Sequence, residues 1–183
     1  MRVITGKARG RKLKDFEGRD IRPTTDMVKE AIFSIIQFDI EGSEVLDLFS
    51  GTGQLGIEAL SRGAKYCRFV DKSRESAALT NENIDLAGFR WESNVVNGDS
   101  LDFLRMARYT FDIALLDPPY NNGLIEQALP LLEPKMSQRG IVVCEHERGL
   151  ELPEEVGRLK RSKTYNYGKV AVTVYRIPFN EEE

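Results

Sequence analysis

VLDLFSGTGQLG, residues 45–56, is the stretch that decides the fold. An apolar run leads there without a break into the pattern G-x-G-x-x-G, formed by Gly51, Gly53 and Gly56. The first two glycines let the backbone turn tightly and approach a ligand, and the third lets a following helix pack closely on the strand. The pattern is weak alone, but a strand-like run precedes it and a helix-like run follows it. We therefore predict a strand, a ligand-binding loop and a helix, the order found in open α/β sheets.

Regular alternation of strand-like and helix-like runs surrounds this loop. Strands are predicted over 44–49, 66–70, 93–96, 112–116 and 140–144, and helices over 54–62, 73–87, 99–107 and 124–132. Such alternation is typical of parallel strands covered by helices on both faces. The tail differs, because two β-rich runs, 158–167 and 169–177, meet at Gly168 and predict an antiparallel hairpin. The predicted fold class is a Rossmann-like α/β fold with a mostly parallel seven-stranded sheet.

The first 22 residues differ from the rest of the chain in composition. They are basic and contain three spaced glycines, Gly6, Gly10 and Gly18, which predict a small hairpin or arm packed on a main domain over 23–183. A helix capped by Thr24 or Thr25 should follow, because apolar residues recur on one helical face at Val28, Ala31, Ile32, Ile35 and Ile36.

The charge of the chain is unevenly distributed. The net charge of −3 alone argues against a nucleic-acid partner, but residues 1–14 carry six basic residues and no acid, and so do residues 158–176. Two basic segments on an acidic body fit an anionic partner such as RNA, although a solvated face explains either segment alone about as well.

The remaining bulk features point to a cytoplasmic protein of one domain. A length of 183 residues suits one domain, the N-terminus lacks the apolar core of a signal peptide, and no apolar run is long enough to span a bilayer. Cys67 and Cys144 match no metal or redox spacing and are expected to be buried, reduced thiols. His146, which follows the fifth predicted strand, lacks neighbouring metal ligands and is assigned a structural or gating role. Trp91 is expected to pack within its loop.

Acidic residues at successive strand ends distinguish two cofactor classes. Asp71 comes twenty residues after Gly51, where a carboxylate can accept hydrogen bonds from ribose hydroxyls. Asp99 ends the third strand and can accept from an adenine amino group. Asp47 lies inside the first strand, where it would repel a pyrophosphate but could bind a ligand's ammonium group. The set favours S-adenosyl-L-methionine over a nicotinamide cofactor, although a helix N-cap explains Asp71 or Asp99 taken singly.

The fourth predicted strand ends in Asp117-Pro118-Pro119-Tyr120. In an open α/β sheet this position lies beside the glycine loop, at the edge where ligands bind. The Asp117 carboxylate and the Pro118 carbonyl could accept the two N–H groups of a nucleobase amine, and Pro119 would hold that carbonyl rigidly. Tyr120 offers a flat face for an unstacked base. The four residues are interpreted as an amine clamp, against the alternative of a strand end with a core tyrosine.

These motifs together resemble the bacterial RsmD family. The resemblance rests on Asp117-Pro118-Pro119-Tyr120, Asp47-Leu48-Phe49-Ser50-Gly51-Thr52-Gly53, Arg22-Pro23-Thr24, the opening residues 2–11 (RVITGKARGR) and Tyr167-Gly168-Lys169. It covers nearly the whole chain and implies a class I S-adenosyl-L-methionine-dependent methyltransferase. Members of that family methylate the N2 amine of a guanine in 16S rRNA of the small ribosomal subunit.

The resemblance and the motifs together give three sets of candidate residues. The catalytic set is Asp117, Pro118 and Tyr120. The cofactor set is Asp47, Phe49, Gly51, Gly53, Asp71, Asp99 and Ser100. The RNA-binding set is Arg2, Lys7, Arg9, Arg11, Lys12 and Arg22.

The expected partner is 16S rRNA or the small ribosomal subunit, bound by a monomer without a metal ion or a membrane. Four alternatives stay open: a DNA adenine or cytosine amino-methyltransferase, a protein-amide methyltransferase, a nicotinamide oxidoreductase and a non-catalytic RNA-binding assembly factor. The chain leaves no room for the separate target-recognition domain that a sequence-specific DNA methyltransferase usually needs, which favours recognition of RNA by shape.

Overall fold

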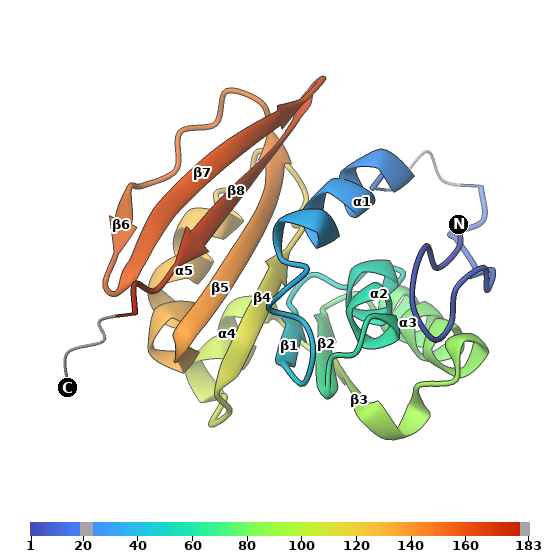
Figure 1. The fold of residues 1–183 in the computed structure, drawn as a ribbon. Coiled ribbons are helices and arrows are strands. Elements are labelled where there is room, and N and C mark those ends of the chain that lie inside the picture. Colours follow the sequence, from blue (N-terminus) through green and yellow to red (C-terminus); the bar gives the residue numbers. More distant parts are fainter. Residues whose placement is uncertain (19–23, 180–183) are drawn as a thin grey trace.

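A computed structural model of the chain describes residues 1–18 and 24–179, and within them it shows one twisted sheet with helices on both faces (Figure 1). The strand order is β3-β2-β1-β4-β5-β8-β7-β6. The strands are β1 Glu44–Asp47, β2 Tyr66–Asp71, β3 Ser93–Asn97, β4 Phe111–Leu116, β5 Met136–Glu147, β6 Glu155–Val156, β7 Leu159–Tyr167 and β8 Val170–Arg176. The first five strands are parallel to one another, and β8, β7 and β6 add antiparallel pairs beyond β5. The predicted fold class is confirmed.

The sheet of the described residues has eight strands where the sequence predicts seven. The additional strand, β6, is only two residues long and pairs with the start of β7, Glu155 with Lys160 and Val156 with Leu159. So short a strand carries no recognisable alternation of apolar and polar residues, and for this reason the sequence does not reveal it.

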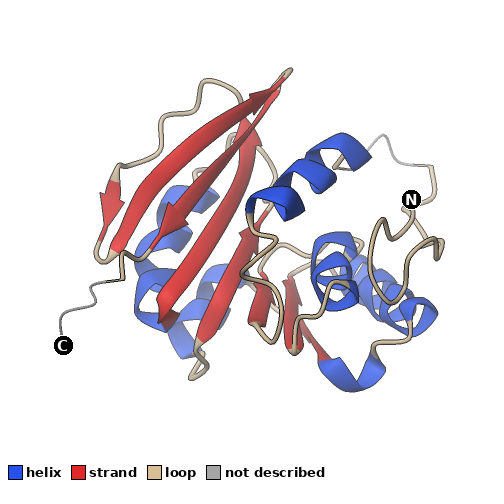
Figure 2. Cartoon of the chain, viewed as in Figure 1, coloured by secondary structure: helices blue, strands red, loops and turns tan. Residues whose placement is uncertain are grey.

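The helices lie where the alternation predicts them (Figure 2). They are α1 Asp26–Ile35, α2 Gln54–Ser61, α3 Arg74–Ala87, α4 Ser100–Met106 and α5 Leu124–Leu132, with 3-10 turns η1 Arg90–Glu92 and η2 Glu133–Lys135. Thr25 rather than Thr24 caps α1, because its side chain accepts a hydrogen bond from the Val28 amide.

Two apolar clusters, one on each face of the sheet, form the core. Helices α1, α2 and α3 contribute to one cluster, and α4 and α5 contribute to the other. Successive residues of a strand point to opposite faces, so Ile113 and Leu115 of β4 belong to the first cluster and Ala114 and Leu116 to the second. Burial on both faces explains why this strand reads as a continuous apolar run.

The topology places the loops after β1 and β4 next to each other. β1 lies between β2 and β4, with Val45 opposite Ile113 and Asp47 opposite Leu115. The chain winds away from β1 in both directions, and ligands of open α/β sheets bind at such a switch point, outside the carboxyl ends of the strands.

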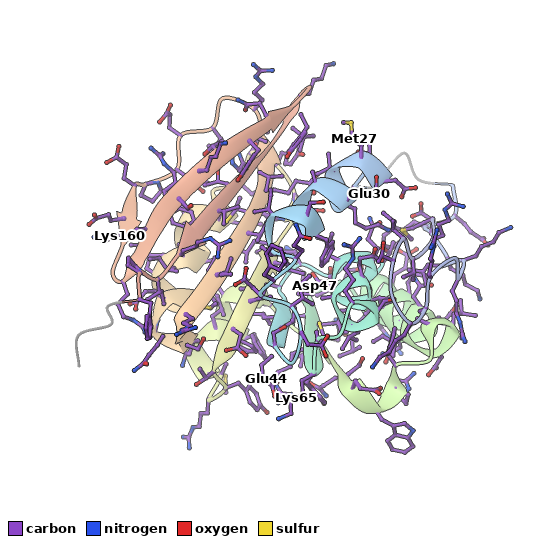
Figure 3. All side chains as sticks on the ribbon, viewed as in Figure 1. Met27, Glu30, Glu44, Asp47, Lys65 and Lys160 are labelled. Carbon is purple, nitrogen blue, oxygen red and sulfur yellow. The ribbon has the colours of Figure 1, made fainter. Side chains whose placement is uncertain are left out.

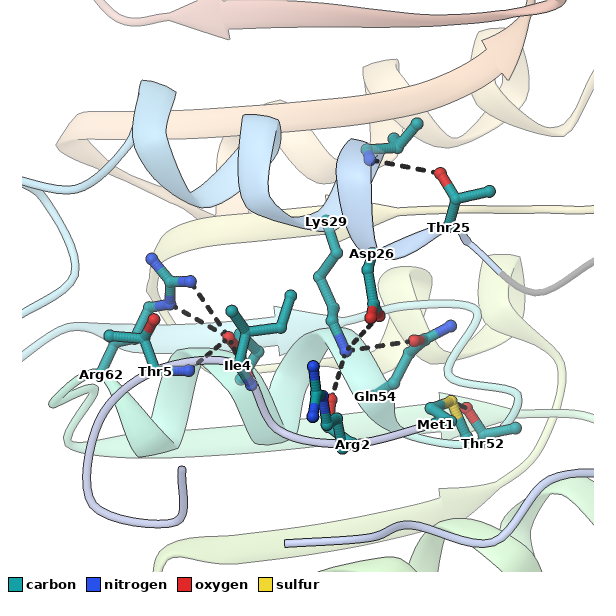
Figure 4. A network of polar contacts seen from close by, with 12 residues as sticks. Met1, Arg2, Ile4, Thr5, Thr25, Asp26, Lys29, Thr52, Gln54 and Arg62 are labelled. Atoms are coloured by element: carbon teal, nitrogen blue, oxygen red, sulfur yellow. Dashed lines mark hydrogen bonds and ion pairs between the residues drawn. The ribbon is translucent and has the colours of Figure 1, made fainter. Parts of the chain in front are cut away.

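Residues 1–14 are fixed to the main body through their backbone (Figure 4). The buried carboxylate of Glu58, in α2, accepts hydrogen bonds from the amides of Ile4 and Thr5 at 3.0–3.2 Å. At the end of α2, the Ser61 carbonyl accepts from the Lys7 amide at 2.8 Å. A single antiparallel bridge, between Arg2 and Lys12, joins the two halves of the segment.

A buried lysine connects this segment to α1. Lys29 is fully buried, and its Nζ donates to the Arg2 carbonyl at 2.9 Å and to Gln54 Oε1 at 3.5 Å (Figure 4). Desolvation lowers the pKa of Lys29, while the charge of Glu58 opposes that effect. The N-terminal segment, α1 and α2 therefore share one polar network inside an otherwise apolar contact.

Replacing Gly6 by alanine should detach this segment. Gly6 has a φ of +94°, and a Cβ there would lie 1.8 Å from the Ser61 carbonyl oxygen. Strain and overlap should lower the free energy of unfolding by about 3 kcal/mol. Gly10→Ala is the matched control, because Gly10 also has a positive φ, +81°, but nothing lies within 4 Å of its Cβ position. Its cost should be about 1 kcal/mol in the same urea titration; equal costs would show that Gly6 is not a docking contact.

Candidate active site

A cavity of about 1020 Å³ opens at the carboxyl ends of the parallel strands. Its walls come from the glycine loop after β1 and from the segments that follow β2, β3 and β4, and the start of α1 and the turn between β7 and β8 close it. Its size suits a ligand as large as a nucleoside cofactor together with part of a second substrate. All predicted catalytic and cofactor residues except Gly53 line it.

The glycine loop has the conformation that its sequence predicts. Gly51 and Gly53 have φ values of +54° and +82°, which favour glycine, and Gly53 is the N-cap of α2. Gly56 lies where a Cβ would meet the Phe69 ring at 2.3 Å, so only glycine lets α2 pack on β2 without rearrangement. The N-terminus of α2 is thereby held at the rim of the cavity.

Asp47, the last residue of β1, lies near the middle of the molecule (Figure 3), and one of its two carboxylate oxygens is hydrogen-bonded. It is 1% exposed, and its Oδ2 accepts from the Gly56 amide at 3.0 Å. Its Oδ1 has no hydrogen-bond partner among the described residues. Burial raises the pKa of Asp47 to about 7, and the charges of Asp117 and Asp71 add to the effect. A buried acceptor without a partner is costly, so this atom fits a ligand that brings a donor, such as an ammonium group.

Asp71 closes the glycine loop from the neighbouring strand. Its Oδ2 accepts from the Gly51 amide at 2.9 Å, and its Oδ1 accepts from the Ser73 amide at 2.9 Å. The carboxylate is partly exposed and lines the cavity. It therefore sets the loop's position and still presents acceptor lone pairs to a ligand, as ribose recognition requires.

The third strand end holds Asp99 and Ser100. Asp99 caps α4, with Oδ1 accepting from the amides of Leu101 and Asp102 at 3.0 Å each. The Ser100 hydroxyl donates to the Leu48 carbonyl at 2.9 Å, which ties α4 to the end of β1. Both residues line the cavity, and so does Phe49, whose partly buried ring packs against the second apolar cluster. The N-cap interpretation of Asp99 thus holds alongside its place on the cavity wall.

The segment after β4 lines the same cavity as the glycine loop. Pro118 is buried, Pro119 is exposed and Tyr120 is partly buried. Asp117 Oδ2 accepts a hydrogen bond from Thr24 Oγ1 at 2.8 Å. Desolvation raises the pKa of Asp117 to about 6, and the hydrogen bond from Thr24 works in the opposite direction. The raised pKa of Asp117 favours uptake of a proton, as a proton acceptor requires.

The structure adds two residues to the site that the sequence interpretation does not include. Thr24 is 7% exposed and Glu145, near the end of β5, is 5% exposed, and both line the cavity. Thr24 Oγ1 lies 3.0 Å from Glu145 Oε2 as well as 2.8 Å from Asp117. The sequence could have indicated Glu145 as a site residue, because this acid directly follows the apolar run 141–144 just as Asp117 directly follows β4.

The predicted RNA-binding residues that the structure describes lie on the protein surface. The side chains of Arg2, Lys7, Arg9, Arg11 and Lys12 are all exposed, whereas Arg22 lies outside the described residues. The Lys7 amide contacts Ser61, the last residue of α2, and Arg11 Nη1 donates to the carbonyl of Leu86, near the end of α3. This part of the segment therefore lies at the ends of α2 and α3 that are remote from the cavity.

Two single-residue predictions need correction. His146 lies within β5 and is 1% exposed, because β5 continues to Glu147 and pairs with β8 over its whole second half. Trp91 does not pack in its loop but is 91% exposed, on the short turn η1 before the edge strand β3.

Cys67 and Cys144 are buried thiols, as predicted. Of the helices in residues 1–18 and 24–179, none combines the length and apolarity needed to cross a bilayer.

Comparison with known proteins extends over almost the whole chain. A family model described as conserved hypothetical protein 95 matches residues 1–176. Ribosomal RNA small subunit methyltransferase D of Haemophilus influenzae is 37% identical over 183 residues, with 96% of this chain and 93% of that protein covered. The protein of the same name from Escherichia coli is 32% identical over 180 residues, with 96% and 89% covered.

A solved structure agrees with these sequence matches. The structure of yhhF from Escherichia coli superimposes with a TM-score of 0.87 at 30% identity and covers 97% of each chain. All residues that line the cavity fall within residues 1–176, which the family model matches. The chain therefore belongs to the family described as conserved hypothetical protein 95, and it is a methyltransferase of the RsmD family that its sequence resembles.

Proposed function

We propose that this chain transfers a methyl group from S-adenosyl-L-methionine to the exocyclic N2 amine of a guanine in 16S rRNA of the small ribosomal subunit. The observation that carries the proposal is the single cavity shared by the glycine loop and residues 117–120. The names of the relatives from Haemophilus influenzae and Escherichia coli support small-subunit rRNA as the substrate.

The residues around the glycine loop fit the cofactor. Asp47 Oδ1, buried and without a partner among the described residues, would accept from the ammonium group of its amino-acid part. Asp71 would accept from the ribose hydroxyls, and Asp99 and Phe49 would line the adenine position. When bound, the cofactor supplies a methyl group on a sulfonium, open to attack by a nitrogen lone pair.

Residues 117–120 would prepare the amine for that attack. An exocyclic amine of a base is a poor nucleophile, since its lone pair is delocalised into the ring. Hydrogen bonds from its N–H groups to the Asp117 carboxylate and the Pro118 carbonyl would localise the lone pair and fix its direction. Tyr120 would stack on the base, worth about 1–3 kcal/mol by comparison with other base–aromatic contacts. Asp117 would also receive the proton that the amine loses.

Incubation with labelled cofactor tests the proposal and its rivals together. The substrates are small ribosomal subunits from a strain that lacks this methylation, mature subunits and plasmid DNA. We expect label in the rRNA of the unmethylated subunits alone. Label in DNA would favour a DNA amino-methyltransferase, and RNA binding without transfer would favour an assembly factor. A thermal-shift comparison of S-adenosylhomocysteine with NADH separates the nicotinamide alternative.

The N-terminal segment should contribute to RNA binding through its charges. Arg9→Ala combined with Arg11→Ala should weaken RNA binding and reduce the slope of log K against log salt by about one to two, since two phosphate contacts are lost. Cofactor affinity should not change, because neither residue lines the cavity.

The matched control for this double variant is Lys65→Ala combined with Arg108→Ala. It removes the same charge from exposed positions that precede β2 and β4, at the amino ends of these strands and outside the cavity. Filter binding at several salt concentrations measures both double variants. Equal slopes for the two would place the RNA elsewhere on the protein.

A further inference from the structure

Two adjacent threonines before α1 have different surroundings. Thr25 is exposed and caps the helix by accepting from the Val28 amide at 3.3 Å. Thr24 is 7% exposed and its hydroxyl turns into the cavity. Helix capping therefore does not account for the Thr24 hydroxyl, and its contacts have to be explained by the cavity.

That hydroxyl lies between two carboxylates. Thr24 Oγ1 is 2.8 Å from Asp117 Oδ2 and 3.0 Å from Glu145 Oε2. A hydroxyl has one proton and can donate to only one of them at a time. Both contacts become hydrogen bonds only when one carboxyl is protonated and donates to the Thr24 oxygen while Thr24 donates to the other. Both hydrogen bonds therefore form when one of the two side chains, Asp117 or Glu145, is a protonated carboxylic acid and the other is a carboxylate.

The sheet keeps Glu145 at this place. β4 and β5 are parallel with Leu116 opposite Cys144, so Asp117, which directly follows β4, and Glu145, the next residue of β5, come at the same level of the sheet. The following residue, His146, is held from both ring nitrogens. Its Nδ1 donates to the Glu147 carbonyl at 2.9 Å, and its Nε2 shares a hydrogen bond of 2.7 Å with the Thr173 hydroxyl. This fixes the end of β5 against β8, and with it the backbone of Glu145.

We propose that Thr24 and Glu145 complete the proton acceptor of the reaction, so that the proton lost by the amine passes to Asp117 and is shared through the Thr24 hydroxyl with Glu145. The inference rests on the proposed function. In that reaction the nitrogen gains a bond to the methyl carbon, the carbon–sulfur bond breaks with its electron pair left on sulfur, and one N–H bond breaks with its pair left on nitrogen. The departing proton adds to an Asp117 oxygen, and a proton shift across Thr24 spreads it to Glu145. Thr24 and Glu145 are positioning residues, and Asp117 touches the reacting amine.

Other titratable groups line the same cavity as these two carboxylates. On the main cavity wall these are the acids Asp15, Asp47, Asp71 and Asp99 and the bases Lys72 and Lys169, together with the phenols of Tyr120 and Tyr167. A smaller cavity of about 290 Å³ on the other side of residues 118–120 adds Glu126, His146 and Glu147. Acids outnumber bases along these walls, while burial is what raises the pKa of Asp117 and the hydrogen bond from Thr24 opposes it.

Thr24→Val, Thr24→Ser and Glu145→Gln test the inference with two measurements. The first is the single-turnover rate of methyl transfer to unmethylated small subunits against pH, at saturating cofactor. At pH 8 we expect Thr24→Val and Glu145→Gln to be about tenfold slower than the wild type, and Thr24→Ser to stay within about threefold, because serine keeps the hydroxyl. Binding of S-adenosylhomocysteine, measured by calorimetry, should be the same for all four proteins.

The second measurement is the titration of the Asp117 carboxyl carbon by NMR, without RNA or cofactor. Thr24→Val removes a hydrogen bond to the carboxylate and should move the midpoint to higher pH. Glu145→Gln removes a neighbouring negative charge and should move it to lower pH. A merely structural role would not shift the same group in opposite directions.

The failure of this inference is distinguishable from failure of the proposed function. If the wild type is active and Thr24→Val is as fast as Thr24→Ser, the inference alone is overturned. It is also overturned if the Asp117 titration midpoint is unchanged in Thr24→Val and Glu145→Gln, or moves in the same direction in both. A wild type that binds S-adenosylhomocysteine but methylates no subunit would overturn the proposed function and the inference with it.

Discussion

Asp117→Asn should reduce methyl transfer by about 10²–10⁴-fold while leaving cofactor affinity and RNA retention near those of the wild type. The amide keeps the size of the carboxylate but cannot take up the proton, and it presents a donor where the amine needs an acceptor. Because Thr24 Oγ1 lies 2.8 Å from Asp117 Oδ2, the amide oxygen can still accept that hydrogen bond, and the local structure should persist. Single-turnover transfer of labelled methyl groups measures the loss.

Asp112→Asn is the matched control for this variant. Asp112 is at the other end of β4, where its Oδ2 accepts from the Glu44 amide at 2.9 Å, away from the cavity. An asparagine can keep that bond, so activity should stay within about twofold of the wild type. If Asp117→Asn retained more than a tenth of the activity, the amine clamp would be the wrong interpretation of residues 117–120.

Asp47→Asn should have the second largest effect, with opposite signs for binding and stability. Loss of the charge should weaken binding of S-adenosylhomocysteine by about 100-fold, because the ligand's ammonium loses a buried ionic partner. The cofactor-free protein, however, should become more stable at pH 8 by about 1–3 kcal/mol, because a desolvated carboxylate with an unsatisfied oxygen disappears. Calorimetry and urea unfolding measure the two effects.

The pH dependence follows from the raised pKa of Asp47. Its folded-state pKa of about 7 lies above the ordinary value of 3.8, so ionisation destabilises the folded state above pH 7, and the cost disappears as the pH falls toward 4. Binding of an ammonium ligand should strengthen as the pH rises to about 7 and then level off, and Asp47→Asn should remove that dependence. Asp102→Asn, an exposed acid in α4, is the control and should change neither property. Ligand affinity independent of pH in the wild type would contradict this role of Asp47.

Features that depend on neighbouring residues could be predicted from the sequence. The glycine loop, the helix after it and the acids at strand ends each follow from a spacing of a few residues, and the parallel topology brings Asp47, Asp71 and Asp117 to one cavity. α5 has the same bounds, Leu124–Leu132, in the prediction and in the structure, because its apolar face is continuous.

Features that depend on distant contacts could not be predicted in this way. Thr24 acquires its role from residues 93 and 121 positions away, which no local pattern indicates. The end of β5 is not predicted, because Glu145-His146-Glu147 is polar and reads as a loop. In the structure these residues pair with β8, and Glu145 and His146 are buried. Trp91 shows the converse error, since a large aromatic residue favours a buried position on average but does not require one.

The central claim is that one cavity brings the methyl group and an RNA amine together at Asp117. The most direct test is mass-spectrometric mapping of the nucleosides of unmethylated small-subunit rRNA after reaction with the wild-type protein and with Asp117→Asn. We expect one new N2-methylguanosine in 16S rRNA with the wild type and none with the variant. A methyl group on another base or on protein, or the same product from Asp117→Asn, would contradict it.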